Sequence, residues 1–363
     1  MTTIAPDDAA DQINVAAGVD THQDTHTAAV VDTAGRLLGH RVFPATGAGY
    51  VALLAWLRTF GVLLVVGIEG TGAYGAGLAR HLRTQDVAML EIDRPDRKTR
   101  RSAGKSDPID AEAAARAALA KVATGIPKAR AGRVEALRNL RVARRSAVDQ
   151  RGDCMRQIKT LIVTAPDDLR ARLRALSDRE LRRTCAALRP DTTRAGEPEQ
   201  AAKIALRSLA RRQTTLTEEI AELDALIEPL VAAINPALLE LNGVGADVAG
   251  QLLVTAGENT ERLRSEAAFA MLCGVAPIPA SSGKTHRHRL NRGGDRQANA
   301  ALYRITLCRL RWDKRTQAYM QRRTTEGLSK KDIIRCLKRL IAREIYYVLT
   351  THQRQTHELA SAA

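Results

Sequence analysis

The chain has 363 residues, of which 45% are hydrophobic and only 3% aromatic, with 56 lysines and arginines against 40 acidic residues. A net charge of +16 predicts a polyanionic partner, although a compositional bias toward alanine and arginine would also raise it. No apolar stretch reaches the roughly 18 residues of a membrane span, and the first residues lack the apolar core of a signal peptide. We therefore expect a cytoplasmic, nucleoid-associated protein of about two domains. The five widely spaced cysteines predict neither a disulfide framework nor a zinc site.

Residues 12–125 alternate strand-like and helix-like patterns. We predict strands over 13–20, 27–32, 36–43, 63–69 and 87–92, and helices over 50–59, 74–83 and 108–121. Three strands in a meander, followed by strands alternating with helices, indicate an α/β domain with a mixed sheet. This order of elements is that of a ribonuclease-H-like (RNase-H-like) domain.

Residues 129–235 carry no strand signal and predict long helices. Apolar residues recur at three-four spacing over 134–162 and again over 209–234, which is typical of a coiled coil or an antiparallel helical hairpin. Arg141, Arg144 and Arg151 lie in the seam of the first helix. They weaken this seam as a buried core, or indicate a negatively charged partner there.

Residues 236–350 are predicted to form a second compact, mostly helical domain. Residues 241–250 have the spacing of a helix-hairpin-helix element, whose Gly-Val-Gly turn is suited either to phosphate binding or to close packing alone. A loop rich in Pro, Gly and Ser follows over 274–283 and contains Ser282. An amphipathic helix with a basic outer side is expected over 328–348.

Four carboxylates are placed where separate elements would deliver them. Asp20 and Glu69 each end an apolar strand, while Asp107 and Asp110 stand three apart at the start of a helix and share a face. Taken singly, each has a plainer explanation, since Asp107 before Pro108 could be an N-cap and Asp110 a first-turn acid. Together they predict a site for Mg²⁺, most simply two ions, which can clamp the attacking and leaving oxygens of a phosphoryl transfer.

Cations accompany both this acidic set and Ser282, and are expected to hold a nucleic-acid backbone, although such runs are often only solvated surface. They are Arg97, Lys98, Arg100, Arg101 and Lys105 before Asp107, and Lys284, Arg287, Arg289 and Arg292 after Ser282. A serine hydroxyl becomes a nucleophile only if its proton is removed and the attacked phosphate is neutralised. The alternative is that the serines of this loop only cap turns.

The quoted motifs resemble those of the DEDD insertion-sequence transposases, the group that includes the pilin-gene-inverting recombinases. The resemblance covers nearly the whole chain. It rests on four segments: Gly18-Val-Asp20 with His22 and His26, Glu69-Gly-Thr-Gly-Ala-Tyr74, Lys105-Ser-Asp107-Pro-Ile-Asp110, and Gly274-Val-Ala-Pro with Ser282-Gly283.

The resemblance implies an N-terminal domain like the resolvase RuvC over 12–125, a coiled coil over 129–235 and a C-terminal transposase domain over 236–350. It implies that Asp20, Glu69, Asp107 and Asp110 bind Mg²⁺ and that Ser282, or its neighbour Ser281, forms a transient 5′-phosphoserine link to DNA. A structured guide RNA from the element and assembly as a dimer or tetramer are also implied.

Two other functions remain open at this stage. One is a RuvC-like junction nuclease in which metal-activated water cuts DNA and Ser282 is incidental. The other is a nucleic-acid-binding scaffold whose acidic cluster is structural.

Overall fold

In the computed structural model, the described residues are 13–92, 106–121, 125–284 and 287–361, with side chains described as far as 351. The chain divides into two compact units. The first comprises residues 1–132 together with 257–264, and the second comprises 133–256 together with 265–363.

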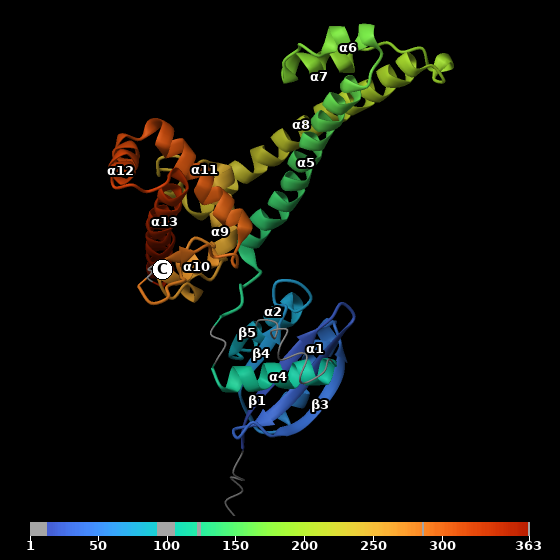
Figure 1. Ribbon diagram of the computed structural model, residues 1–363. Helices are drawn as coiled ribbons and strands as arrows, with labels where there is room; N and C mark the ends of the chain where they lie inside the picture. The colour runs from blue at the N-terminus through green and yellow to red at the C-terminus, as the bar shows by residue number, and fades with distance from the viewer. Residues whose placement is uncertain (1–12, 93–105, 122–124, 285–286, 362–363) are drawn as a thin grey trace, which may run out of the picture. The chain divides into compact units, whose positions relative to one another are not determined.

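The first unit is built on a five-stranded mixed sheet in the order β3-β2-β1-β4-β5 (Figure 1). The strands are β1 (Asn14–Thr21), β2 (Thr25–Asp32), β3 (Leu37–Pro44), β4 (Val62–Glu69) and β5 (Met89–Ile92). β1 to β3 form the antiparallel meander, and β4 pairs in parallel with both β1 and β5. The prediction of an α/β unit with a mixed sheet is confirmed.

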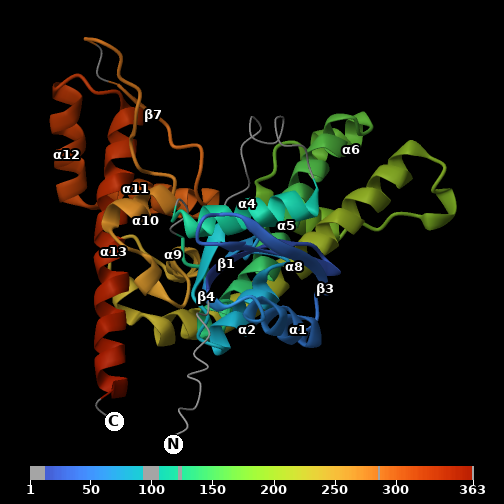
Figure 2. The same cartoon turned by 90° about the horizontal axis from the view of Figure 1, so that it is seen from below.

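Helices cover both faces of this sheet, as Figure 2 shows. α1 (Gly47–Arg58) and α2 (Ala76–Thr84) lie on one face, and α4 (Asp107–Leu119) lies on the other. Side chains alternate between the faces of a strand. Val15, Ala17 and Val19 of β1 therefore pack in the core under α1 and α2, whereas Ala16 packs against Ala115 of α4.

Two glycines bring α4 close to the sheet. A Cβ on Gly18 of β1 would lie 2.1 Å from the backbone of Ala111 and Ala115, and one on Gly67 of β4 would lie 2.6 Å from the carbonyl of Ala114. Only glycine at both positions, opposite an alanine stripe on the helix, allows this approach. The first turn of α4 is thereby fixed over the carboxyl ends of β1 and β4.

A short segment from later in the chain completes the first unit. Residues 257–264 include the 3₁₀ turn η3 (Thr260–Arg262). Asn259 donates to the carbonyl of Pro127 at 3.1 Å and accepts from the backbone N–H of Ala129 at 2.8 Å. Arg262 donates to the carbonyl of Ile126 at 3.0 Å. The backbone of 126–129 thus finds its partners about 130 residues downstream.

The second unit contains two long helices, α5 (Gly132–Val163) and α8 (Pro198–Ile234). Cys154 packs with Leu216 and Ile220, while Ile158 packs in a cluster with Leu206 and Ala210. Later residues of α5 therefore contact earlier residues of α8, so the two helices are antiparallel. They form a helical hairpin, one of the two arrangements that the spacing predicted.

The far end of the hairpin holds two short helices, α6 (Asp167–Leu173) and α7 (Asp178–Ala186), and the 3₁₀ turn η1 (Thr192–Arg194). Sequence reasoning did not separate α6 and α7 from the long helices, although Ser177 and Glu180 form a capping box that marks the start of α7.

Beyond α8 the unit is mostly helical, as predicted. The elements are η2 (Pro236–Leu238), α9 (Ala246–Ala256), α10 (Glu266–Leu272), α11 (Arg296–Trp312), α12 (Lys314–Thr325), α13 (Lys330–Ser361) and a small hairpin of β6 (Ile278–Pro279) and β7 (His288–Arg289). Only a 3₁₀ turn precedes the glycine turn before α9, and Arg309 donates to the carbonyl of Asn242 in that turn at 2.7 Å. This hydrogen bond gives the turn a packing role, and phosphate binding by its amides stays a prediction. Within the described residues, no helix is both long and apolar enough to cross a membrane.

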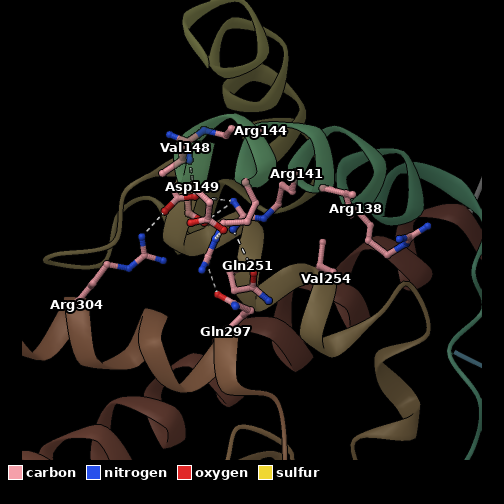
Figure 3. A pocket seen from close by; sticks show the side chains of 12 residues that line it. Arg138, Arg141, Arg144, Val148, Asp149, Gln251, Val254, Gln297 and Arg304 are labelled. Carbon is pink, nitrogen blue, oxygen red and sulfur yellow. Dashed lines mark hydrogen bonds and ion pairs between the residues drawn. The ribbon is translucent and has the colours of Figure 1, made fainter. Parts of the chain in front are cut away.

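Two of the three seam arginines of α5, Arg141 and Arg144, have negatively charged partners within the chain, around a cavity of about 320 Å³ (Figure 3). Asp247 of α9 bonds to Arg141 at 2.9 Å, to Arg144 at 3.3 Å and to Arg304 of α11 at 2.6 Å. Arg144 also pairs with Asp224 of α8. One carboxylate thus ties the base of the hairpin to the C-terminal helices.

Candidate metal centre and serine loop

Asp20 and Glu69 lie at neighbouring strand ends on the face that α4 covers. Val19 pairs with Ile68 in the parallel ladder, and both side chains belong to the core under α1 and α2. The next residue of each strand, Asp20 and Glu69, therefore faces the other side. The hydroxyl of Thr21 donates to the carbonyl of Glu69 at 2.8 Å and ties the two strand ends together.

The first turn of α4 brings Asp107 and Asp110 to the same edge of the sheet. Ser106 occupies the N-cap position and Asp107 is the first helical residue, so the plainer explanation of Asp107 as the N-cap is wrong. Asp110 is buried on the same stripe as Ala111 and Ala114. A carboxylate there is favoured by the helix dipole, but it also points toward the strand ends.

Three side chains converge closely at this edge. The ligand atoms of Asp20, His22 and Asp107 all lie within 4.8 Å of one another. His22 Nε2 is 3.2 Å from a carboxylate oxygen of Asp20 and 3.5 Å from one of Asp107. Glu69 shares the face and the edge but does not belong to this cluster of three.

The electrostatics of the cluster centre on Asp20. Burial raises the pKa of the Asp20 carboxyl above its usual range, the neighbouring His22 lowers this pKa, and the charges of Asp107 and Asp110 raise it again. Like charges gathered around a buried carboxyl destabilise its ionised form unless a cation compensates. Such a set of carboxylate oxygens is the donor chemistry that Mg²⁺ prefers, and it fits a divalent ion held by Asp20 and Asp107 with Asp110 close by.

His22 is the site residue that sequence reasoning missed. It was noted in the motif but was not assigned to the site. The available signal was its spacing, because residues two apart in an extended strand face the same side and Asp20 was already a candidate. His22 hydrogen-bonds Asp20 and lies beside Asp107, a placement from which an imidazole can orient carboxylates, as the outer partners of metal ligands commonly do.

Ser282 lies in the loop between β6 and β7 and is exposed to solvent. The hydroxyl of its neighbour Ser281 accepts from the backbone N–H of Arg287 at 3.3 Å, whereas no hydrogen bond of the Ser282 hydroxyl is found within the described part of the chain. Gly283 has φ +53°, a conformation that glycine adopts without strain. The Ser281 hydroxyl is therefore engaged in a hydrogen bond within the loop, whereas Ser282 is exposed.

The predicted cations divide between exposed and undescribed positions. Around the serine, Lys284, Arg287, Arg289 and Arg292 are all exposed. The other predicted phosphate contacts, namely Arg97, Lys98, Arg100, Arg101 and Lys105, lie outside the described residues. The acidic cluster belongs to the first unit and Ser282 to the second.

Two regions of the chain match known transposase families. Residues 17–165 match the IS110-type DEDD transposases, and residues 235–321 match the transposase family of IS116, IS110 and IS902. The first match contains Asp20, Glu69, Asp107 and Asp110, and the second contains Ser282.

Proteins of two insertion elements are similar to parts of the chain. An uncharacterised 43.6 kDa protein of insertion element IS110 from Streptomyces coelicolor is 33% identical over 127 residues, which are 34% of this chain and 31% of that protein. An uncharacterised 42 kDa protein of insertion element IS900 from Mycobacterium paratuberculosis is 27% identical over 157 residues, which are 42% of this chain and 39% of that protein. The matches thus span well under half of these relatives. The two family matches, with the acidic edge and the serine loop each inside one of them, show that the chain belongs to the DEDD-type insertion-sequence transposases.

Proposed function

We propose that this protein is a transposase that cuts and rejoins DNA at the ends of its own insertion sequence. The observation that carries the proposal is the convergence of Asp20, His22 and Asp107 at the edge of the mixed sheet, under the first turn of α4. The strand order and the place of this edge support a ribonuclease-H-like, RuvC-like catalytic unit. The net charge of +16 supports a nucleic-acid substrate.

In this proposal Asp20, Glu69, Asp107 and Asp110 hold Mg²⁺, most simply two ions. When bound, the metal would neutralise the phosphate and stabilise the charge that develops on the attacking and leaving oxygens. The residues of this chain set up that chemistry before any metal binds. Gly18 and Gly67 seat α4, the Thr21 hydroxyl joins the strand ends, and His22 orients two of the carboxylates.

Ser282 is proposed as the nucleophile. Its oxygen attacks the phosphorus of a DNA phosphodiester and forms a serine–phosphate bond, while the bond from phosphorus to the 3′ oxygen breaks. The serine proton leaves to a base, and the departing 3′ oxygen takes up a proton, so a 3′-hydroxyl and a 5′-phosphoserine result. Attack by another 3′-hydroxyl on this link reverses the step and rejoins DNA. Lys284, Arg287, Arg289 and Arg292 are exposed nearby and suit the phosphate backbone.

The proposal includes a structured RNA from the element that pairs with donor and target DNA, so that base pairing carries the sequence readout. It also includes assembly as a dimer or tetramer through coiled-coil contacts of the α5–α8 hairpin. Val142, Val163 and Leu226 are exposed apolar residues on these two helices and support such contacts.

The test is a covalent adduct. Purified protein, Mg²⁺, the element's RNA and donor DNA labelled at the 3′ end are separated on a denaturing protein gel, because serine retains the fragment with the 5′ phosphate. The wild type and Ser281→Ala are expected to give a labelled adduct, and Ser282→Ala and Asp110→Asn to give none. Cutting by Ser282→Ala without any adduct would establish a water-dependent, RuvC-like nuclease instead, and salt-sensitive binding without cutting by the wild type would leave a scaffold.

A mixing experiment identifies which protomer supplies the acids. Ser282→Ala and Asp110→Asn are each inactive in the proposal but carry complementary intact centres. An adduct restored by mixing the two would show that one protomer's acidic edge serves the serine of another. Failure of the mixture, when each variant binds DNA normally, would place both centres in one chain.

A further inference from the structure

Exposed aromatic side chains gather on the C-terminal helices. The whole chain has only 2 Trp, 6 Tyr and 3 Phe. Within the described residues, the Tyr and Trp side chains with the largest exposed fractions are Tyr74, Tyr303, Trp312 and Tyr347, at 55%, 42%, 70% and 55%. Three of these four belong to α11 and α13. Such exposure in a chain so poor in aromatics indicates a binding surface rather than a core.

A groove of about 990 Å³ is lined by residues that include parts of α11, α12 and α13, and Tyr347 is the member of these four aromatics that lines it. Two tyrosines, Tyr319 of α12 and Tyr347 of α13, line it together with four arginines, Arg309, Arg315, Arg322 and Arg343. The two acidic residues of the lining are both engaged. Asp313 caps α12 by accepting from the backbone N–H of Thr316 at 2.9 Å, and Glu344 accepts from Arg309 at 2.6 Å. The rest of the lining combines cationic and aromatic side chains with apolar ones, among them Leu337, Leu340 and Ile341.

The guanidinium groups are arranged for a ligand that has both a flat ring and a phosphate. Arg322 stacks over the ring of Tyr319 at 5.4 Å, is 67% exposed and lies 3.8 Å from its nearest carboxylate, Glu326. Arg309 forms the floor, where Nη1 bonds Glu344, Nε bonds Asn242, and the buried Nη2 has no acceptor within the described residues. Arg343 also reaches Glu266 at 3.2 Å, so Arg315 and Arg322 are the two most available cations.

We propose that this groove binds an unpaired DNA strand, with a base stacked on Tyr347 and the backbone phosphates held by Arg315 and Arg322. Aromatic faces accept the face of any base only when the base is not enclosed in a duplex, and arginines beside them neutralise the phosphates. The choice of DNA rests on the proposed function, in which DNA is opened and cut. The groove shares no residue with the acidic edge or with the serine loop.

The test measures equilibrium binding by fluorescence anisotropy of a labelled 20-nucleotide DNA at fixed salt, as single strand, as duplex, and as RNA of the same sequence. Binding of the DNA single strand, rather than of the duplex, is expected to depend on the groove. Tyr347→Leu is expected to weaken single-strand binding about tenfold, the loss of about one stacked base, while Tyr347→Phe keeps the ring and the affinity. Tyr303→Leu is the matched control, because Tyr303 is an exposed tyrosine of the same unit that does not line the groove, and it is expected to leave binding unchanged.

Direct contact is tested with a single strand that carries iodouracil. Irradiation and peptide mapping are expected to place cross-links in residues 313–351. Equal losses for Tyr347→Leu and Tyr303→Leu, a loss for Tyr347→Leu that is as large on the duplex or on the RNA strand, or cross-links only elsewhere would overturn the proposal. The anisotropy assay measures binding and needs no strand cutting. Its result therefore does not depend on the outcome of the adduct assay, which tests the proposed function. If the wild type forms the adduct but Tyr347→Leu binds the single strand as tightly as the wild type, the groove proposal is wrong and the proposed function stands.

Discussion

Gly18 and Ala115 approach so closely that a Cβ on Gly18 would lie 2.1 Å from the backbone nitrogen of Ala115. Gly18→Ala is therefore expected to displace α4, since backbone on both sides cannot yield as a flexible side chain would. Overpacking of this kind costs about 3 kcal/mol of unfolding free energy. Chemical denaturation measures the loss.

The matched control for this change is Gly47→Ala, at the start of α1, where an added Cβ meets nothing within 4 Å. Its unfolding free energy is expected to stay within about 0.5 kcal/mol of the wild type. Equal stability of Gly18→Ala and Gly47→Ala would mean that α4 does not pack on β1 as described.

Mg²⁺ is expected to stabilise the first unit. A ligand that binds only the folded state adds about 2.7 kcal/mol at a concentration of 100 times its dissociation constant. Hydrogen exchange should therefore slow in β1 and α4 when Mg²⁺ is added to the wild type, and should not respond in Asp20→Asn. Asp86→Asn, an exposed acid after α2, serves as the control and should respond like the wild type. If Mg²⁺ also slowed hydrogen exchange in Asp20→Asn, the ion would not bind at this edge of the sheet.

Loss of the Asp247 carboxylate is expected to destabilise the second unit. Asp247→Asn would leave Arg141, which is 12% exposed, without its ion pair, and removing the charged partner of a partly buried group costs about 2 kcal/mol. The comparison is Asp149→Asn, whose carboxylate pairs with Arg145 but is 60% exposed, with an expected cost below about 1 kcal/mol. Comparable losses for the two variants would argue against a shared, partly buried network.

The ion pairs of Glu266 predict an acid-dependent loss of stability. Hydrogen bonds from Arg339 and Arg343 lower the pKa of the Glu266 carboxyl from 4.5 to about 2. Because the folded-state pKa is depressed, the stabilisation is complete above pH 4.5 and is lost as the pH falls through about 2. Chemical denaturation of the wild type and of Glu266→Gln should therefore give unfolding free energies whose difference is constant above pH 5 and becomes smaller toward pH 2. A difference that does not change with pH would refute the pairing.

The elements of the first unit could be predicted from the sequence because local patterns determine them. Apolar runs that end in Asp20 and Glu69 are strands, and the alanine-rich segment after Pro108 is a helix, within a few residues of the prediction. The places of Asp20 and Asp107 at element ends indicated that these two acids lie close together, as they do. The roles of Ser282 and of the four carboxylates in catalysis remain predictions.

What sequence patterns could not supply were contacts between distant residues. The partner of Arg141 and Arg144 is Asp247, about 100 residues later, and nothing in the heptad spacing of α5 indicates it. Assigning His22 to the site required knowledge that Asp107 lies beside it in the fold. The hydrogen bonds of residues 126–129 to Asn259 and Arg262 likewise depend on a segment with no periodic pattern of its own.

That last segment gives the chain an unusual connectivity. Because residues 257–264 fold with the first unit while α9 before them and α10 after them belong to the second, the backbone crosses between the units three times, near 132, 256 and 264. One proteolytic cut near 256 or 264 would leave the two units covalently linked, and a cut near 132 would leave residues 257–264 of the first unit on the fragment that carries the second unit. A fragment that stops at residue 132 would also lack residues 257–264, whose side chains hydrogen-bond the backbone of residues 126–129. Truncation at one position therefore does not yield the complete first unit.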